Sequence, residues 1–434
     1  MRTFYVGFGY FLLKFSGSFE VASCIALGAS GSASGACGSS PFLRPENMVH
    51  QIMPMKINPA PRDSSNSNSM RWLLACGYRV LIVGTLLAAG ALTACANTAP
   101  SEAGVIQQAR SRWVPVPWAE LPGLGADPLF EAWNAWIKSC EKPVAPFAAL
   151  CAEVRRLSIG SPEEQLGWMQ QRLQPYRVES VQGESSGVLT GYFEPILEAS
   201  RTPANGFAVP LYRAPAGLAQ RKPWFTRQEI DTVPEVQAAL AGREIVYLAD
   251  PVDAMMLHVQ GSGRIYITQP DGSPRWLRLA YAGTNDQPFK SAPRWLLGQG
   301  LVRDASWPGV KAWLAQNPQR LQELTWINPR MVFFKEEPLS DLDAAFGPRG
   351  AQGVALTPGR SIAVDPGSIP YGTPVWLVSN GAHANLQKLV LAQDTGSAIT
   401  GAVRADYFAG WGPQAGELAG RLKQSLQLWV LWPK

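Results

Sequence analysis

The spacing of apolar residues predicts helices at the start of the folded region and strands after it. Between residues 129 and 173, large apolar side chains recur at helical spacing, at Phe130, Trp133, Trp136 and Ile137. Ser161 is placed to cap a second helix, and Pro162 fits its first turn, where no backbone N–H is needed. Beyond Tyr176 the helical spacing gives way to short apolar runs broken by glycine and proline, which indicate strands and turns.

These strand-like runs form an early group and a late group. The early run, GVLTGYFEPILEAS, predicts a strand through Gly191, and Pro195 bars the residues beyond it from a central ladder position. From Asn328 on, five short apolar runs follow one another: RMVFFKE, RSIAVDP, TPVWLV, QKLVLAQD and LQLWVLW. Short strands separated by glycine and proline turns indicate a barrel.

Residues 206–325, between these groups, have a different texture. The segment begins proline-rich, and Thr226 is placed to cap a helix. The run AMMLHVQGSGRIYIT predicts a strand from Ala254 to Thr268. Helical segments are expected around residues 295–301 and 310–316. No internal repeat accompanies these changes.

The first 94 residues resemble a leader and not a domain. Residues 1–69 show no sustained period, and we expect them to be a disordered extension ahead of the true start at Met70. Arg71 and Arg79 then precede an apolar stretch, Val80 to Ala91, that is short for a membrane-spanning helix. A basic region, an apolar stretch and small residues before a cleavage point are typical of an export signal, here residues 70–94.

The end of this leader carries a further signal. Leu-Thr-Ala-Cys at residues 92–95 resembles the lipobox of bacterial lipoproteins, which implies that Cys95 is diacylated and becomes the mature N-terminus. Ala96 follows the cysteine and favours the outer membrane, so we expect a lipid-anchored protein on the periplasmic side of that membrane. The alternative is an uncleaved anchor with an incidental cysteine. Residues 95–112 then form a polar tether.

Composition narrows the class of protein. The chain has 434 residues, 46% of them apolar and only 16% charged, with 41 glycines and 36 prolines, which suits a globular protein rich in strands and turns. The formal net charge of +5 comes mostly from the leader, because its removal leaves 31 basic and 30 acidic residues. A nearly neutral exported chain without a basic stripe gives no support for nucleic-acid binding.

Six cysteines are present, and export leaves only Cys140 and Cys151 beyond the lipidated Cys95. The two are spaced to join the ends of two antiparallel helices, and an oxidising compartment would permit a disulfide. Two buried free thiols are the alternative. Neither cysteine has the spacing of a metal ligand set.

The exported part of the sequence lacks the residues or motifs that several classes of catalytic site require. The exported part keeps only His258 and His383, which are far apart and show no ligand spacing, so no metal is expected. We expect His258 to be a hydrogen-bonded core residue in a strand. Ser262 lies between glycines but does not match a nucleophile elbow, and no strand-to-helix unit makes GSG a phosphate loop. Carboxylates remain, and LAQDTGSAITGAVRADYF places Asp394 and Asp406 around a turn of small residues at a strand end.

Six motifs in order resemble the membrane-bound lytic murein transglycosylase A family. They are TGYFEP, PLYRAP, VQGSGRI, YAGTND, RSIAVDPGSIPYGTPVW and AQDTGSAITGAVRADYFAGWG, and the match covers residues 113–433. Each motif alone is weak, but six in sequence behind a lipobox are a strong signal. The late part resembles the family's three-aspartate domain, with Asp365, Asp394 and Asp406 as its aspartates.

The resemblance implies a mainly β fold with N-terminal helices. Its centre would be a double-psi β-barrel built from both chain ends, residues 113–205 and 326–434, with a smaller β-rich domain inserted at residues 206–325. The implied partner is a peptidoglycan glycan strand, and complexes of cell-wall synthesis and hydrolysis enzymes are further expected partners. No cofactor is expected.

The implied reaction cuts the β-1,4 bond between N-acetylmuramic acid and N-acetylglucosamine and forms a 1,6-anhydro ring. Because the attacking hydroxyl belongs to the substrate, one carboxyl group can act first as acid and then as base. The resemblance assigns this role to Asp406 and makes Asp394 a second catalytic-site residue that orients the turn or the sugar. Asp365 precedes a proline and is expected to form a turn. Burial should raise the pKa of the acid.

Sugar contacts are expected from two of the motifs and from the late turn: Thr190, Gly191, Tyr192, Gln260, Gly261, Ser262, Ser397 and Ala398. Glycine lets the backbone approach a sugar, and glutamine offers both a donor and an acceptor. The alternative is that these residues pack the barrel or form turns. Ser397 stands where the family often has glycine.

Two other functions are alternatives to this one. The same barrel occurs in expansin-like proteins, so a non-catalytic glycan-binding module is one alternative. A hydrolytic muramidase is the other. The motifs of the inserted domain favour the transglycosylase.

Overall fold

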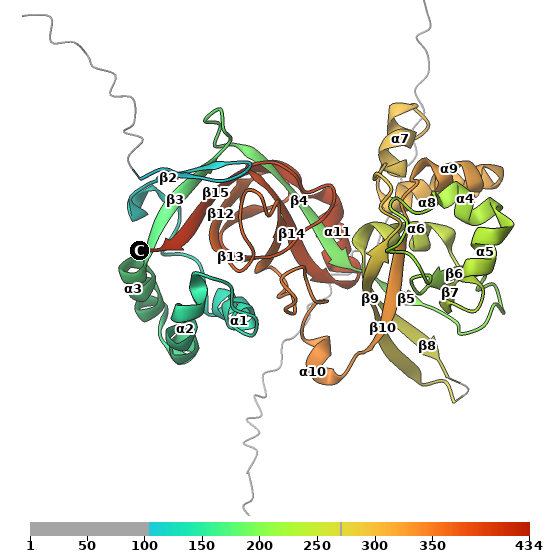
Figure 1. Ribbon diagram of the computed structural model, residues 1–434, viewed down its shortest axis with the longest axis horizontal. Coiled ribbons are helices and arrows are strands. Elements are labelled where there is room, and N and C mark those ends of the chain that lie inside the picture. Colours follow the sequence, from blue (N-terminus) through green and yellow to red (C-terminus); the bar gives the residue numbers. More distant parts are fainter. Residues whose placement is uncertain (1–103, 270) are drawn as a thin grey trace, which may run out of the picture. The chain divides into compact units, whose positions relative to one another are not determined.

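The computed structural model describes residues 104–434 except residue 270 (Figure 1). The chain divides into a unit of residues 1–95 and a unit of residues 96–434, and only the second is described below. The expected extension, the signal peptide and the lipidated Cys95 therefore lie outside the described residues. In the part of the chain that is described, none of the helices combines the length and apolar character needed to cross a bilayer.

One large sheet joins both ends of the described chain. Its nine strands run in the order β1-β2-β3-β15-β12-β13-β11-β14-β4. Their bounds are Ile106–Gln107 (β1), Arg112–Pro115 (β2), Leu173–Glu179 (β3), Gly187–Glu194 (β4), Ser361–Val364 (β11), Pro374–Asn380 (β12), Asn385–Asp394 (β13), Arg404–Trp411 (β14) and Lys423–Pro433 (β15). Strand β15 also pairs with β4, so the strands from β15 to β4 close into a ring. Strand β4 lies beside the red C-terminal strands in Figure 1.

The late strands with continuous apolar runs are buried on both faces. In β13, Leu389 and Leu391 pack in a cluster with helix residues, whereas Val390 and Ala392 pack in a second cluster made almost wholly of strand residues. Alternate side chains of a strand point to opposite faces, so a strand covered on both faces is apolar throughout. This explains why QKLVLAQD does not alternate between apolar and polar residues.

Three helices cover one face of this sheet. They are α1 (Leu129–Ser139), α2 (Cys151–Arg156) and α3 (Pro162–Arg172), with short 3₁₀ turns at Trp118–Glu120, Phe147–Leu150 and Leu157–Ile159. The predicted cap of α3 is confirmed, because Ser161 and Glu164 form a reciprocal capping box. Trp133, Trp136 and Trp168 meet with ring centroids 5.2–5.8 Å apart and anchor the helices to each other.

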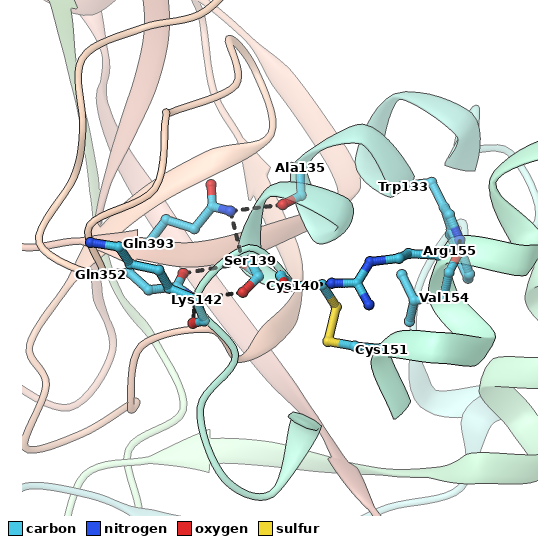
Figure 2. Close-up of a disulfide and its surroundings, with 10 residues drawn as sticks. All are labelled: Trp133, Ala135, Ser139, Cys140, Lys142, Cys151, Val154, Arg155, Gln352 and Gln393. Carbon is cyan, nitrogen blue, oxygen red and sulfur yellow. Dashed lines mark hydrogen bonds between the residues drawn. A yellow bond between two sulfur atoms is a disulfide. The ribbon is translucent and has the colours of Figure 1, made fainter. Parts of the chain in front are cut away.

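A disulfide and a glutamine hold α1 in place (Figure 2). Cys140 at the end of α1 is bonded to Cys151 at the start of α2, so the first of the two alternatives for these cysteines is correct. On the other side of α1, Gln393 of β13 donates from its amide nitrogen to the carbonyl of Ala135 and to the hydroxyl of Ser139, both at 2.8 Å. Helix α1 is thereby tied to the residue that precedes Asp394.

Two smaller sheets and a group of helices lie between β4 and β11. The sheets have the orders β10-β9-β8-β5 and β6-β7. Their strands are Ile196–Glu198 (β5), Val209–Tyr212 (β6), Glu244–Leu248 (β7), Gly263–Thr268 (β8), Pro274–Thr284 (β9) and Val332–Pro338 (β10). The helices are Arg227–Thr232 (α4), Pro234–Leu240 (α5), Pro251–Gln260 (α6), Ala292–Gly298 (α7), Trp307–Gln316 (α8), Leu321–Ile327 (α9) and Asp341–Ala344 (α10), with a 3₁₀ turn at Pro318–Arg320. A further helix, Gly412–Arg421 (α11), lies between β14 and β15.

The expected strand from Ala254 to Thr268 is wrong in its first half, which forms α6. Asp250 caps this helix by accepting from the N–H of Val252, and Pro251 occupies its first turn. Gly261 ends the helix with a φ of 82°, and only then does β8 begin. These end signals outweigh the apolar run, because a short apolar run is compatible with a buried helix as well as a strand.

Three other expectations need correction. The late run RMVFFKE, predicted among the barrel strands, forms β10 and pairs with β9 in the inserted sheet. The fold is mixed α/β and not mainly β, because helices α4 to α9 accompany the strands of the inserted β-rich part. Residues 106–107, expected to belong to a polar tether, form β1 and pair with β2. A two-residue strand has no detectable period, which is why the pattern did not reveal it.

A buried ion cluster joins β4 to the inserted sheet. Glu194, the last residue of β4, is fully buried and accepts from Arg264 of β8 at 2.9 Å and from Arg278 of β9 at 2.6 Å. The two guanidinium groups also donate to the carbonyls of Ala344 and Phe346. With these partners satisfied, a charge-rich group can sit in the interior without an orphaned donor.

Replacement of Glu194 by Gln should therefore destabilise the fold strongly. The neutral amide of Gln cannot balance the charges of the two buried arginines, so we expect the free energy of unfolding to fall by roughly 3–5 kcal/mol. Urea denaturation measures the change. The matched control is Glu337→Gln, which removes a partner of the exposed Lys335, 2.7 Å away, and should cost at most about 1 kcal/mol. Equal effects of the two variants would contradict a structural role for the cluster.

Candidate active site

Asp394 and Asp406 are brought together by the register of three strands. Asp394 ends β13 and Asp406 lies in β14, and both pair with Ala363 of β11, one from each side. On its other side Asp406 pairs with Thr190 of β4. Neighbouring strands lie about 4.8 Å apart, so the two aspartate backbones are about 10 Å apart, close enough for their side chains to act on one ligand.

The carboxyl group of Asp406 has one oxygen held and one oxygen without a donor among the described residues. The Thr190 hydroxyl donates to Oδ1, and the Arg404 guanidinium donates to that hydroxyl at 2.8 Å. Burial raises the pKa of Asp406, and the Thr190 hydrogen bond and the charge of Arg404 oppose that rise. A carboxyl group whose proton is retained above the usual range and whose second oxygen is unengaged suits a general acid.

Asp394 is more fully engaged. Tyr192 donates from its hydroxyl to Oδ2 at 2.9 Å, and the Ala351 N–H donates to Oδ1 at 2.9 Å. Burial raises the pKa of Asp394 to about 6, hydrogen bonds from the Thr395 and Ala351 backbones and from Tyr192 oppose the rise, and the charge of Asp406 adds to it. Burial likewise raises the pKa of Tyr192 well above its usual value, so this hydroxyl stays a donor.

The turn between the two aspartates is held by Asp365. Its carboxylate, almost fully buried, accepts from the N–H of Gly367 at 2.9 Å and from the N–H of Gly401 at 2.8 Å. Gly401 belongs to the segment that joins β13 to β14. The expectation that Asp365 forms a turn agrees with these contacts, which leave its oxygens committed to backbone donors.

Four of the eight predicted sugar-contact residues lie at or beside the aspartates, and the other four have structural contacts. Thr190 and Tyr192 reach the aspartates, as described, and Ser397 and Ala398 are exposed on the turn beside them. Gly191 lies in the same strand but turns toward α11, where a Cβ would come within 2.8 Å of the Ala419 backbone. Its small size is therefore needed for packing, as in the alternative interpretation.

The three residues of the VQGSGRI motif have structural contacts. Gln260 accepts with its side-chain oxygen from the N–H of Phe193 at 3.0 Å, Gly261 ends α6, and Ser262 is buried. Gln260 therefore ties α6 to the strand that carries Thr190 and Tyr192. None of these three contacts Asp394 or Asp406 in the described structure.

Two residues near the aspartates, Arg404 and Arg330, have no role predicted from the sequence. Arg404 lies two residues before Asp406, and residues two apart in a strand share a face. The sequence could therefore have indicated that Arg404 lies beside Asp406. Arg330 donates to the hydroxyl of Ser397 from a segment far away in the chain. No local pattern could have revealed that contact.

His258 differs from its expected setting in one respect. It lies in helix α6 and not in a strand, but it is buried and hydrogen-bonded, accepting from the Val332 N–H at 3.3 Å. Burial and the charge of Arg227 lower the pKa of His258 to about 3, so the ring is neutral. Within residues 104–434, leaving out residue 270, His, Cys, Asp and Glu form no group of three that could hold a metal ion.

Two sequence families match the described part of the chain. Residues 188–335 match the MltA specific insert domain, and residues 360–432 match the 3D domain. The insert match begins within β4 and ends within β10, and the 3D match contains Asp365, Asp394 and Asp406.

Individual proteins agree with these matches. The membrane-bound lytic murein transglycosylase A of Vibrio cholerae is 30% identical over 316 residues, which are 70% of this chain and 75% of that protein. The structure of a lytic transglycosylase, LtgG, from Burkholderia pseudomallei is 41% identical with a TM-score of 0.53 and covers 76% of this chain and 97% of its own. The structure of MltA from Escherichia coli with bound chitohexaose is 25% identical with a TM-score of 0.60 and covers 77% and 97%.

The two domain matches follow one another in the order that the six motifs predict, and the relatives span most of the described chain. The chain belongs to the membrane-bound lytic murein transglycosylase A family.

Proposed function

We propose that this protein cleaves the glycan strands of peptidoglycan as a lytic transglycosylase, with Asp406 as its single acid and base. The observation that carries the proposal is the environment of Asp406. Its carboxyl group is partly buried, has a raised pKa, and keeps one oxygen clear of other donors in the described structure. A relative in this family binds chitohexaose, a β-1,4-linked glycan, which fits a glycan substrate here.

The reaction begins with proton transfer from Asp406 to the oxygen that links N-acetylmuramic acid to N-acetylglucosamine. The bond from that oxygen to the muramic acid C1 breaks, and positive charge develops at C1. The C6 hydroxyl of the same muramic acid then attacks C1, and the Asp406 carboxylate takes up the hydroxyl proton. The products are a 1,6-anhydromuramic end and a free 4-hydroxyl, the enzyme recovers its proton, and water does not enter.

The hydrogen bonds of Asp394 favour this course over hydrolysis. A hydrolytic muramidase needs a second carboxylate to activate water or to attack C1. Both oxygens of Asp394 already accept protein donors, from Tyr192 and from the Ala351 backbone. We therefore assign Asp394 to hold Tyr192 and the turn, or to orient a sugar, with Thr190, Tyr192, Ser397 and Ala398 as sugar contacts.

The finer fold assignment is also a proposal. A double-psi β-barrel formed by residues 113–205 and 326–434, with residues 206–325 inserted, is supported by the ring closure through β15 and β4 and by the parallel pairs β4–β14 and β11–β13. The inserted sheet extends beyond these bounds, because it includes β5 and β10. Parallel neighbours in a sheet that is otherwise antiparallel require crossing connections, as such a barrel has.

Asp406→Asn and Asp394→Asn should separate the two roles. The Asp406→Asn side chain would keep the shape of the aspartate but exchange no proton, so release of anhydro-muropeptides from murein sacculi should fall by more than roughly 10²–10⁴-fold. Asp394→Asn should be milder in rate or should act through stability. Product masses and thermal melting of both variants give the comparison. Near-normal release by Asp406→Asn, with a stable but inactive Asp394→Asn, would reverse the assignment, and reducing ends in place of anhydro ends would indicate a hydrolase.

Activity should fall as pH rises, because Asp406 must start protonated and its pKa is raised. The charge of Arg404 lowers that pKa, so Arg404→Gln should raise it and move the alkaline limb of the kcat profile upward by up to about 1 pH unit. Arg421→Gln is the control, since Arg421 is exposed and its ion-pair partner among the described residues is Glu417 on the same helix. A profile of Arg404→Gln that coincides with those of the control and the wild-type protein would show that Asp406 does not govern the alkaline limb.

Attachment to the periplasmic side of the outer membrane rests on Cys95, which lies outside the described residues. Relatives are named membrane-bound. Replacement of Cys95 by Ala should leave the enzyme folded and active but release it from the membrane fraction, because no acyl chain can then be attached. Fractionation followed by an activity assay measures this, and unchanged membrane association would overturn the lipid anchor.

A further inference from the structure

A narrow pocket in the inserted part has three cationic side chains and, among the described residues, no acidic one in its lining. It lies among α4, α6 and the segments before α7 and β10, and its lining includes Arg227, His258, Lys290, Thr325, Asn328 and Arg330. The apolar part of the lining is formed by Met255, Val259, Ala292, Pro293 and Trp307. The space inside is about 20 Å³. A water molecule needs about 10–15 Å³ measured in this way, so the pocket admits one small polar group and excludes a sugar ring.

Two of the pocket's positive charges are not neutralised locally. Arg227 is paired with Asp231 at 3.0 Å. Lys290 and Arg330 form no ion pair within the described residues. Asp286, whose pKa the charge of Arg330 lowers, is itself paired with Lys222 at 3.2 Å. His258 adds no charge, because burial keeps it neutral. The pocket therefore carries a net positive charge and favours an anionic group.

Arg330, which lines the pocket, also contacts the turn between the two aspartates. One guanidinium nitrogen of Arg330 donates to the hydroxyl of Ser397, on the turn between Asp394 and Asp406. Its Nε is buried with no acceptor in the described structure. Arg294 of α7 is close enough to Arg404 to affect it electrostatically, so a second cation from the insert also faces this region. Arg330 therefore connects the pocket to the turn that carries the proposed sugar contacts Ser397 and Ala398.

We propose that the pocket binds a carboxylate of the murein strand, carried either by the lactyl group of muramic acid or by the peptide attached to it. Lys290 and Arg330 make the charged contacts, and Asn328 offers a further polar group. This inference rests on the proposed function, because it names a specificity contact for the same glycan. Arginine and lysine bind carboxylates through charge-assisted hydrogen bonds, and the small volume admits a carboxylate where it excludes a ring.

The test compares three ligands that differ in their carboxylates. Peptide-bearing murein carries peptide carboxylates, peptide-free strands carry free lactyl carboxylates, and chitohexaose carries none. The kcat/KM for anhydro-product release is measured on the first two, and the Kd is measured for chitohexaose. Lys290→Gln and Arg330→Gln remove pocket charges. Lys335→Gln is the control, because it removes one exposed charge from the same inserted part outside the pocket.

We expect each pocket variant to lose about tenfold in kcat/KM on a carboxylate-bearing substrate, mainly through KM, with the Lys335→Gln control unchanged. Chitohexaose affinity should be unchanged in Lys290→Gln, the variant that leaves the Arg330 contact with Ser397 in place. Loss on peptide-bearing murein alone identifies a peptide carboxylate, because the lactyl carboxyl is there joined to the peptide as an amide. Loss on peptide-free strands alone identifies the lactyl carboxylate, and loss on both substrates shows that the pocket accepts either one. No loss on either substrate, or an equal loss of chitohexaose affinity in Lys290→Gln, would overturn the proposal. Absence of anhydro products from the wild-type protein would instead count against the proposed function.

Discussion

The pairing of β14 between β11 and β4 is the constraint on which the candidate site depends. It puts Asp406 between Ala363 and Thr190 and, through β11, level with Asp394. Side chains alternate across a strand, so a slip of one residue in β14 would turn Asp406 to the opposite face and bring Ala405 or Tyr407 in its place. Closure of the ring through β15 and β4 opposes such a slip, because β4 must satisfy β14 and β15 together.

The three aspartates of the late domain differ in their hydrogen-bond donors, and this difference determines which role each one suits. Asp365 accepts from backbone N–H groups on both oxygens and holds the turn. Asp394 accepts from Tyr192 and from a backbone N–H, and burial still raises its pKa to about 6. Asp406 has the fewest donors of the three in the described structure and a raised pKa. Donors stabilise the anion and burial stabilises the acid, so their balance separates a structural carboxylate from one suited to proton transfer.

The inserted part is tied to the ring through the end of β4 and through the turn beside the aspartates. Glu194 binds Arg264 and Arg278, Phe193 donates to Gln260, and farther along the chain Arg330 reaches Ser397. The role of the TGYFEP and VQGSGRI motifs is therefore largely structural. They hold α6 and β8 against the strand that carries Thr190 and Tyr192. A motif residue can be essential to a site by fixing its frame without touching the ligand.

The sequence by itself determined the helix caps at Ser161 and Thr226, the late strands, and Asp394 and Asp406 as the candidate carboxylates, because these depend on local spacing and on motifs read in order. Only the tertiary structure decided that residues 251–260 form a helix, that Gly191 serves packing against Ala419, and that Cys140 and Cys151 are joined. It also revealed the cations around Arg330 and the charge balance at Glu194. Most of these depend on partners tens to hundreds of residues apart or on competition between local signals, and the disulfide depends on how two helix ends meet. Burial, which sets the pKa of a carboxylate, exists only once such partners have met.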